Sequence, residues 1–266
     1  MALPIVLTIA GSDSSGGAGI QADLKTFAAL GVYGASVITA LTAQNTRGVS
    51  GIHPVPADFV TAQMEAVFGD LDIKAVKIGM VAQAATIDAI AAGLTKRVPR
   101  HVVLDPVMVA TSGDHLLMPE AVDALRTKLI PQASLMTPNL LEAAALLGEP
   151  QAHDEAAIES QGRKLLAMGC AAVLIKGGHG QGADSIDYLF SPHGTVALAA
   201  PRIATVNTHG TGCSLSSAIA AGLARGEDLE TAVREAKVWI SGAIKDADRL
   251  GVGHGHGPIH HFHRFY

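Results

Sequence analysis

The sequence predicts an α/β fold in which helices wrap a mainly parallel sheet. Along the 266 residues, short β-rich runs alternate with helical stretches, and polar residues follow the ends of several β-rich runs. Repeated βα units of this kind are typical of parallel sheets covered by helices. The chain has neither a linker-like stretch nor an internal repeat, so one domain over residues 1–266 is the simplest division.

The first half of the chain predicts four strands and three helices. Residues 5–10 are an apolar run ending at Gly11, and residues 18–30 place apolar side chains at helical spacing. This pattern indicates a strand, a glycine loop and a helix. The next expected elements are a strand at 35–41, a helix at 57–68, a strand at 75–78, a helix at 84–94 and a strand at 101–104.

The second half continues the alternation. Its expected elements are a strand at 135–137, a helix opening at Asn139, a helix at 156–168, a strand at 172–175, a hairpin at 184–199 and a helix at 214–224. Ligands of open α/β sheets bind beyond the carboxyl ends of the strands. We therefore expect the residues that follow the strands to meet on one rim: Gly11, Gln44, Gly79, Asp105, Asn139 and Lys176.

Composition excludes several classes of protein. The formal charge is −5 and the basic residues are scattered, so nucleic acid is not an expected partner. No Lys or Arg precedes Lys25, so the apolar start lacks the basic region of a secretory signal and we expect a cytoplasmic protein. The uncharged runs 26–46 and 203–224 contain glycines and many polar residues, which indicates buried core and no membrane partner.

Residues 207–217, NTHGTGCSLSS, combine a glycine turn with the start of a helix. Gly210 and Gly212 bracket Thr211 just ahead of Cys213. The first turn of a helix has unpaired N–H groups and partial positive charge, so we expect an oxyanion or phosphate there. The alternative is a tight loop capped by Thr211 or Ser214. Cys213 lies where a thiolate is stabilised, which favours a reactive thiol whose pKa is lowered.

The first glycine loop, residues 11–23, contains a G-x-G-x-x-A pattern at 17–22. A dinucleotide site of this type also needs an acidic residue about 20 positions further on, and no Asp or Glu occurs between Asp23 and Asp58. The sequence also lacks any Gly-Lys pair, so it has no P-loop. Adjacent glycines Gly16 and Gly17 suit a hinge or a structural turn.

Polar residues at the strand ends form a possible phosphoryl-transfer set. Such a reaction needs a cation for the phosphates, a pocket of hydrogen-bond donors and a positioned acceptor oxygen. Lys176 follows a strand and precedes two glycines, so its ammonium is a candidate for phosphate binding, or else a solvated loop lysine. Asp105, Asn139 and Glu142 offer oxygens of the kind that Mg²⁺ prefers. Glu142 also suits the first turn of a helix without any metal.

Seven stretches resemble the bacterial hydroxymethylpyrimidine/phosphomethylpyrimidine kinases of thiamine biosynthesis, and the resemblance runs nearly end to end. They are GSDSSGGAGIQADLKTF at 11–27, AQNT at 43–46, KIGM at 77–80, DPVM at 105–108, TPN-x-x-E at 137–142, KGGH at 176–179 and NTHGTGCS at 207–214. The resemblance implies a three-layer α/β/α, ribokinase-like fold with a mainly parallel central sheet, small lid elements and a homodimer.

The resemblance also implies roles for individual residues. Cys213 takes the position of the catalytic base, which is an aspartate in most of the superfamily. The other implied catalytic residues are Gly210, Thr211 and Gly212 in the anion hole and Lys176 at the phosphate. Asp105, Asn139 and Glu142 lie on the ATP and Mg²⁺ side, with Asp105 and Glu142 nearest the metal. The implied pyrimidine pocket comprises Gly11, Asp23, Gln44, Met80 and Val107. His209, beside the glycines, is a further candidate for the site or a loop histidine satisfied by backbone.

Five histidines crowd the C-terminal stretch: His254, His256, His260, His261 and His263. Such a cluster can bind transition metals. No acidic or cysteine ligand lies near it in sequence, and members of the resembling family similarly end in a Gly-x-Gly-x-Gly-Pro-x-His-His tail. We therefore expect a packed tail.

The resemblance thus implies a kinase that transfers the γ-phosphoryl of ATP, with Mg²⁺, to 4-amino-5-hydroxymethyl-2-methylpyrimidine and then to its monophosphate. The primary amide of Gln44 can pair with an amino donor beside a ring-nitrogen acceptor, which an aminopyrimidine has and pyridoxal lacks. Two alternatives remain open from the residues. One is a pyridoxal or pyridoxine kinase on the same fold, and the other is an NAD-dependent oxidoreductase.

Overall fold

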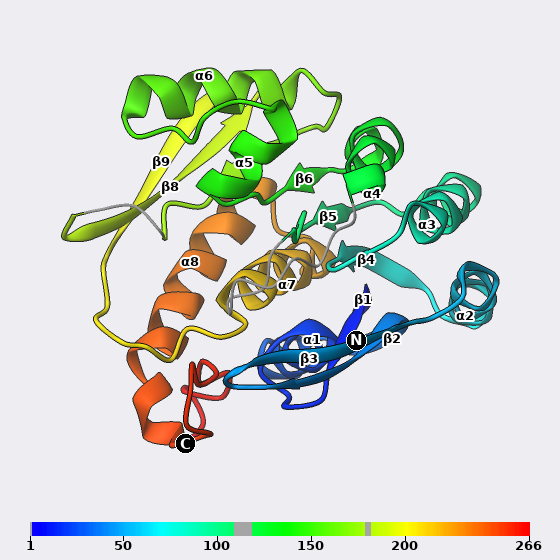
Figure 1. Cartoon of the computed structure of the whole chain (residues 1–266), viewed down its shortest axis with the longest axis horizontal. Coiled ribbons are helices and arrows are strands. Elements are labelled where there is room, and N and C mark those ends of the chain that lie inside the picture. The colour runs from blue at the N-terminus through cyan, green and yellow to red at the C-terminus, as the bar shows by residue number, and fades with distance from the viewer. Residues whose placement is uncertain (1, 109–118, 179–181) are drawn as a thin grey trace.

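The central feature of the computed structural model is one nine-stranded sheet (Figure 1). The structure describes residues 2–108, 119–178 and 182–266. Within these residues the strand order is β3-β2-β1-β4-β5-β6-β7-β8-β9. The strands are β1 (Ile5–Asp13), β2 (Tyr33–Asn45), β3 (Gly48–Pro54), β4 (Ile73–Ile78), β5 (Val102–Leu104), β6 (Leu135–Met136), β7 (Val173–Ile175), β8 (Asp184–Ser191) and β9 (Gly194–Pro201).

The strands from β2 to β7 in this order run parallel, and β3, β8 and β9 are antiparallel additions at the two edges. The inner parallel strands β5, β6 and β7 are continuous apolar runs because both faces of the sheet are covered there. In β5 and β7 all three residues are buried. A mainly parallel central sheet is therefore confirmed.

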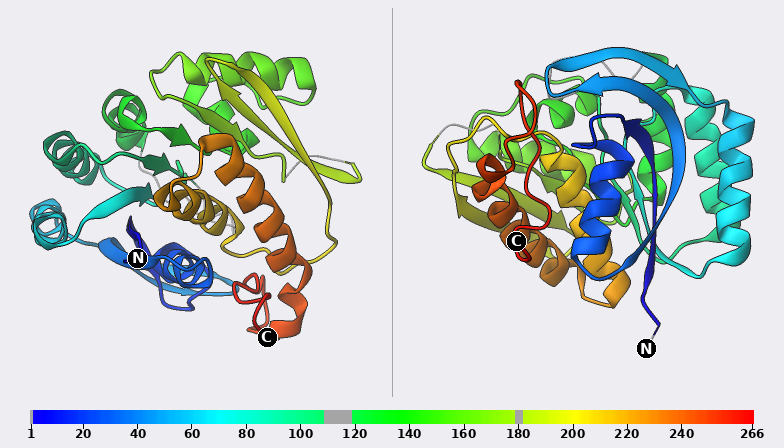
Figure 2. Two further views of the ribbon diagram at one scale, coloured as in Figure 1. Left: turned by 180° about the vertical axis from the view of Figure 1, so that it is seen from behind. Right: turned by 90° about the horizontal axis from the view of Figure 1, so that it is seen from below.

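Helices cover both faces of the sheet (Figure 2). The helices are α1 (Gly19–Ala29), α2 (Ala57–Asp70), α3 (Ala84–Arg97), α4 (Pro119–Ala124), α5 (Leu140–Leu147), α6 (Glu155–Leu166), α7 (Thr211–Arg225) and α8 (Leu229–Lys245). One apolar core lies between the sheet and the group α2 to α6, and a second lies between the sheet and α1, α7 and α8. The expected three-layer α/β/α arrangement is confirmed.

Each strand and helix expected from the sequence is present, with ends shifted by a few residues. Two larger elements were missed. Helix α8 has a strongly amphipathic sequence that the sequence analysis did not assign. Strand β3 has two glycines and a mainly exposed surface, so it lacks the alternating apolar pattern by which a strand is recognised.

Strand β2 is longer than expected, and this corrects the position of Gln44. The strand runs to Asn45, so Gln44 lies inside it, paired with Val49 of β3, and not beyond a strand end. Similarly, Gly11 lies inside β1, next to a shift in the β1–β2 register. Both residues nevertheless remain at the carboxyl end of the parallel strands.

The hairpin expected at 184–199 is present as β8 and β9, with Pro192 and His193 in its turn. It forms an edge of the central sheet, and α6 and α8 pack against it. The antiparallel pair at the opposite edge is β2–β3, whose tip projects toward the C-terminal segment (Figures 1 and 2). No helix in the described part of the chain is long and apolar enough to span a membrane.

Candidate active site

Three strand ends bring together the polar residues expected to meet. Asp105 follows β5, Asn139 follows β6 and Lys176 follows β7. The Lys176 amide donates to the Pro138 carbonyl at 2.8 Å, which joins the last two segments. The Lys176 ammonium lies 2.8 Å from Oδ1 of Asp105 and 3.9 Å from Oε2 of Glu142. Three of the six residues expected on the rim therefore meet, because parallel strands end at the same edge of the sheet.

This cluster places one cation between two buried carboxylates. Burial alone would lower the pKa of Lys176, but Asp105 and Glu142 raise it above its ordinary value. Burial raises the pKa of Glu142 to about 7; Asp105 adds to this rise, while Lys176 opposes it. Lys176 is therefore a fixed positive charge, and Glu142 titrates near neutral pH.

Glu142 also has the structural role considered from the sequence, that of an acid in the first turn of a helix. Asn139 is the N-cap of α5 and accepts from the Glu142 amide at 2.9 Å, while Glu142 Oε2 accepts from the Asn139 amide at 2.7 Å. This reciprocal capping box satisfies two N–H groups of the helix start. Its hydrogen bonds use the Oε2 oxygen of Glu142. Similarly, Asp105 accepts from Thr137 and Lys176 through Oδ1 alone among the described residues.

The glycine turn at the start of α7 leaves backbone amides without an acceptor among the described residues, and this group of donors is called the cradle below. Gly210 is the N-cap in a left-handed conformation and no side chain caps the helix, so the tight capped loop is not what forms. The hydroxyl of Thr211 donates instead to the Thr208 carbonyl at 2.7 Å. The amides of Gly212 and Cys213 have no acceptor among the described residues. A Cβ added to Gly212 would lie 3.3 Å from the Lys176 ammonium, so these donors and this cation share one space.

The glycine loop that contains Gly17 contacts the glycine turn that contains Gly210, and this contact explains why residue 17 is a glycine. A Cβ on Gly210, whose φ is +80°, would lie 3.0 Å from the carbonyl carbon of Gly17. A Cβ on Gly17 would in turn lie 3.1 Å from Nε2 of His209 and closer still to its ring carbon. Gly17 does not have positive φ. Close approach of the two loops therefore explains this glycine, whereas a hinge is not needed.

Cys213 lies in the first turn of α7 as expected, but the sign of its pKa shift is opposite to the expectation. Burial raises the pKa of the thiol to about 11; Lys77 and the Gly19 amide lower it, and Asp23 and Asp105 raise it further. Two nearby carboxylates and a half-buried position thus outweigh the helix terminus. Cys213 is a neutral thiol at pH 7 in this structure.

Asp23 lies in the interior, and this corrects its placement in the pyrimidine pocket. Its side chain is 0% exposed and forms an ion pair with Lys77, 2.9 Å from both carboxylate oxygens. Thr8 donates to Asp23 at 2.6 Å and Ser217 at 2.7 Å. With both oxygens occupied and no exposed surface, Asp23 has no atom free to touch a ligand directly.

Lys77 was assigned no role from the sequence. It is a fully buried lysine in β4, and although burial alone would lower its pKa, Asp23 raises it, so Lys77 stays protonated. Its position within the otherwise largely apolar strand Ile73–Ile78 was the sequence signal that could have identified it as a buried charge. Because Ser217 lies one turn after Cys213, the ion pair joins α7 to α1 and β4 directly beneath the thiol.

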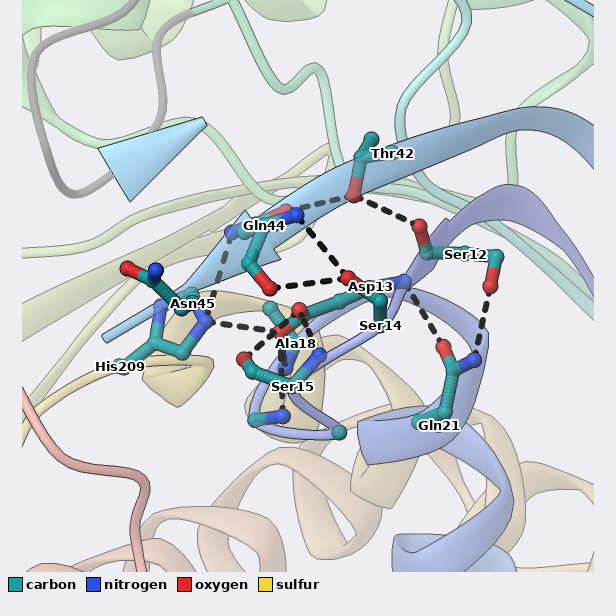
Figure 3. Close-up of polar contacts among 12 residues, drawn as sticks. Ser12, Asp13, Ser14, Ser15, Ala18, Gln21, Thr42, Gln44, Asn45 and His209 are labelled. Carbon is teal, nitrogen blue, oxygen red and sulfur yellow. Dashed lines mark hydrogen bonds and ion pairs between the residues drawn. The ribbon is translucent and has the colours of Figure 1, made fainter. Parts of the chain in front are cut away.

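A second polar network surrounds Gln44 (Figure 3). Oδ2 of Asp13 lies 2.8 Å from Nε2 of His209 and accepts from the amides of Gly17 and Ala18 at 3.0 and 2.8 Å. Burial would raise the pKa of Asp13, but hydrogen bonds from His209, from Ser15 and from the Ala18 amide lower it to about 2. Asp13 is therefore ionised and His209 Nε2 must donate to it. The sequence analysis named His209 but missed Asp13.

The hydrogen count around Gln44 fixes the orientation of its amide. The Thr42 hydroxyl lies 2.9 Å from the Ser12 carbonyl and 3.0 Å from Oε1 of Gln44, and one hydroxyl hydrogen cannot serve both. Nε2 of Gln44 lies 3.5 Å from Nε2 of His209, which already donates to Asp13. Both conflicts disappear when the amide turns by 180° so that its nitrogen donates to Thr42. Gln44 then keeps one N–H and its carbonyl oxygen for another partner.

Met80 and Val107 were also expected in the pyrimidine pocket, and the structure places Met80 against Gly11. Met80 is 8% exposed, its carbonyl accepts from the Thr39 hydroxyl at 2.8 Å, and its methyl carbon would lie 2.8 Å from a Cβ on Gly11. Val107 is half-buried two residues after Asp105. His179, the last residue of the KGGH stretch, lies outside the described residues.

The expected packed tail is confirmed for His260 and His261, whereas His254 and His256 are exposed and His263 is half-buried. His260 and His261 are 4% and 5% exposed, and His261 Nε2 lies 2.9 Å from the Ser214 hydroxyl. Burial lowers the pKa of His261 to about 3, so its ring is neutral. The described residues contain no group of three or more histidine, cysteine or acidic side chains that could hold a metal ion.

Solved structures of small-molecule kinases have this fold. An ADP complex of Bacillus subtilis pyridoxal kinase matches with a TM-score of 0.91 and 35% identity, over 100% of both chains. A phosphomethylpyrimidine kinase from Clostridium difficile 630 matches with a TM-score of 0.81 and 45% identity, over 91% of this chain and 100% of that chain. The fold and the site together define a small-molecule kinase of the ribokinase-like class.

Sequence comparison then gives the family. A family model described as phosphomethylpyrimidine kinase matches residues 13–260. The hydroxymethylpyrimidine/phosphomethylpyrimidine kinase of Rhizobium meliloti (strain 1021) is 59% identical over 262 residues, 98% of each chain. The chain belongs to the phosphomethylpyrimidine kinase family. The expected phosphotransferase of thiamine biosynthesis is confirmed, and the NAD-dependent oxidoreductase is ruled out.

Proposed function

We propose that this kinase transfers the γ-phosphoryl group of ATP to the hydroxymethyl oxygen of 4-amino-5-hydroxymethyl-2-methylpyrimidine, and then phosphorylates the monophosphate to the diphosphate. The observation that supports this most directly is the cradle at the start of α7. Two unpaired amides, Gly212 and Cys213, and the Lys176 ammonium face the same space, where charge in transit would be stabilised.

The carboxylates of Asp105 and Glu142 fit a magnesium site of the kind found with nucleotides. Mg²⁺ is usually held by one or two carboxylates together with waters and phosphate oxygens. Oδ2 of Asp105 accepts no hydrogen bond from the described residues, so it offers one oxygen, and the Glu142 carboxylate, which accepts from the amides of Asn139 and Met108, offers its remaining lone pairs. When bound, the metal would neutralise charge on the phosphates, and Lys176, held by Asp105, would supply the fixed cation beside it.

Cys213 lies where the acceptor hydroxyl would approach the cradle. We assign it the position of the base, but as a thiol that orients the hydroxyl and not as a preformed thiolate, because its pKa is about 11. A loose phosphoryl transition state asks little of a base, so positioning can suffice. Asp23, through Ser217 and Lys77, would hold this turn of α7 in place.

Recognition of the ring by Gln44 separates the two vitamin substrates. In the amide orientation that satisfies Thr42, one N–H and the carbonyl oxygen of Gln44 remain free. This donor and acceptor match the amino group and ring nitrogen of the aminopyrimidine, whereas pyridoxal offers no such pair. Gly11, Met80, Val107 and His209 would complete the walls of this pocket.

Pyridoxal phosphorylation is kept as a second candidate because pyridoxal kinases match the fold with a TM-score of 0.91. Gln44→Leu tests the choice. We expect it to cost about 1–3 kcal/mol in kcat/KM with the aminopyrimidine and distinctly less with pyridoxal. Steady-state kinetics with both alcohols measure this. Equal losses would indicate that Gln44 is a structural residue, and pyridoxal would then be as well supported a substrate as the aminopyrimidine.

We further propose that the kinase acts in the cytoplasm as a homodimer. Leu41 and Ile52 of the β2–β3 pair are 48% and 39% exposed, and a second copy would remove this apolar surface from water. Sedimentation velocity tests the dimer, and a monomer at micromolar concentration would oppose it.

A further inference from the structure

The glycine-rich segment 251–258, called the strap below, lies between two parts of the candidate site. On one side it contacts the tip of the β2–β3 pair, and on the other it contacts the loop that leads into the glycine turn of α7 (Figures 1 and 2). These two parts are more than 150 residues apart in sequence. The proposed function uses Gln44 from the first part and His209 from the second.

The strap binds the tip of the pair through Thr46, two residues after Gln44. The His256 amide donates to the Thr46 carbonyl at 2.8 Å. The amides of Gly255 and His254 donate to the Thr46 hydroxyl at 3.1 and 3.3 Å. Three successive backbone amides of the strap therefore hold one residue of the tip.

The last residues of the strap bind Asn207 and His209, in the loop that leads into the glycine turn of α7. The Gly257 amide donates to Oδ1 of Asn207 at 2.9 Å, and the Gly257 carbonyl accepts from the His209 amide at 3.0 Å. Pro258 lies against Gly17, where a Cβ would be 3.3 Å from the proline ring. The strap thus fixes the backbone of His209, whose ring faces Asp13 and Gln44.

Three glycines of the strap have no room for a side chain. A Cβ on Gly255 would lie 2.7 Å from the carbonyl carbon of Thr46 and 3.1 Å from Cα of Arg47. A Cβ on Gly253 would overlap the Thr46 side chain, and one on Gly257 would overlap Asn207. At Gly255 the obstacle is backbone, so no rotamer change relieves it. The end of the chain is anchored separately, because Ile259 is 0% exposed and the His260 amide donates to the Ala243 carbonyl.

We infer that the strap is a positioning element for substrate recognition: it sets the distance between Gln44 on β2 and His209 in the loop that leads into α7. Thr46 and Gly255 are its positioning residues, since their contacts are with each other and act on the site through Gln44 and His209. The inference rests on the proposed function for the identity of the substrate. The nucleotide side, formed by Asp105, Glu142 and Lys176, has no contact with the strap among the described residues.

Gly255→Ala tests the inference, with Gly69→Ala as the matched control. Gly69 lies in α2, has nothing within 4 Å of its missing Cβ and does not have positive φ, so alanine fits there. We expect Gly255→Ala to raise KM for the aminopyrimidine alcohol about ten-fold, since one or two hydrogen bonds are lost. The affinity for ATP, from titration, should change less than about two-fold, and Gly69→Ala should match the wild type.

Thr46→Val is the second variant, in case Gly255→Ala does not fold. It keeps the shape and the carbonyl of Thr46 but removes the acceptor for two strap amides. We expect KM to rise in the same direction, and Thr46→Ser, which keeps the hydroxyl, should restore it. A general loss of packing would lower ATP affinity equally and would not be rescued by serine.

Hydrogen exchange separates failure of this inference from failure of the proposed function. Amides of residues 42–50 should exchange faster in Gly255→Ala or Thr46→Val than in Gly69→Ala, whichever alcohol is the substrate. A wild-type enzyme inactive on the aminopyrimidine would overturn the proposed function but not the strap. Unchanged KM together with unchanged exchange at 42–50 would overturn the inferred role of the strap. A loss of ATP affinity as large as the rise in KM would also overturn it.

Discussion

The buried ion pair between Asp23 and Lys77 makes a quantitative prediction about what holds the first turns of α7 in place. Both side chains are 0% exposed, and the Lys77 ammonium lies 2.9 Å from each carboxylate oxygen. The perturbation is Lys77→Met, which keeps the length and apolar stem of the side chain and removes the charge. Asp23 is then left in the core with two hydroxyl donors, Thr8 and Ser217.

The magnitude follows from what remains around Asp23. Removing one partner of a buried pair costs about 3–5 kcal/mol of folding free energy, because the other charge stays buried and uncompensated. Thr8 and Ser217 still donate to the carboxylate, so we expect about 3 kcal/mol for Lys77→Met. Asp23→Asn should cost a similar amount, since it strands the ammonium. The double variant removes both charges and should cost less than the sum by about 1–3 kcal/mol.

The assay is urea unfolding followed by tryptophan fluorescence. Trp239, the single tryptophan, is 2% exposed on α8, which packs against α7. Lys74→Met is the matched control, because Lys74 lies on the same strand with an exposed side chain that pairs with Asp72. We expect the control within about 1 kcal/mol of the wild type. A Lys77→Met enzyme equally close to the wild type, or a double variant that costs the full sum, would refute the reasoning.

Three further predictions concern the titrating groups of the site. Because the Cys213 pKa is about 11, its alkylation by iodoacetamide, followed by peptide mass spectrometry, should quicken about ten-fold per pH unit from pH 7 to 9. A flat rate would contradict the raised pKa. Cys213→Ala should lose about 10²–10⁴-fold in turnover and keep its ATP affinity, and full turnover would remove Cys213 from the mechanism. The pKa of Glu142 is about 7 in the folded protein against an ordinary 4.5, so the folded state binds the extra proton between these values and stability falls as pH rises through them. Glu142→Gln keeps an acceptor for the helix cap, so relative to the wild type it should gain about 3 kcal/mol between pH 5 and 8. Unfolding of both proteins across this range measures the difference, in which the opposite contribution of His261 cancels.

The meeting of Asp105, Asn139 and Lys176 was predictable because it depends only on topology. Each residue follows an apolar run, the runs belong to βα units, and parallel strands of such units end at the same edge. The glycine turn before Cys213 was predictable for a local reason. Its two glycines and the helical run after them lie within a few residues, so neither depends on distant contacts.

The pairings of Asp23 with Lys77 and of Asp13 with His209 could not be read from the chain in the same way. The first pair is separated by 54 residues and the second by 196. Asp23 in particular is an acid just after a glycine-rich loop, as a ligand-binding acid could be, and only its zero exposure shows that its partners are internal. The β2–β3 pair escaped prediction because exposed, glycine-rich β3 has no buried face to impose an alternating pattern.

Taken alone, the amino-acid order determined the parallel sheet, the glycine turn at the start of α7 and the family, since each depends on local periodicity or on short motifs. Tertiary structure decided the protonation states of the site residues and the distances between them. The first turn of α7 by itself would lower the pKa of Cys213, yet burial beside Asp23 and Asp105 raises it to about 11. Desolvation and Coulomb interactions depend on atoms that come close only when the chain is folded, so their sign was not contained in the spacing of residues.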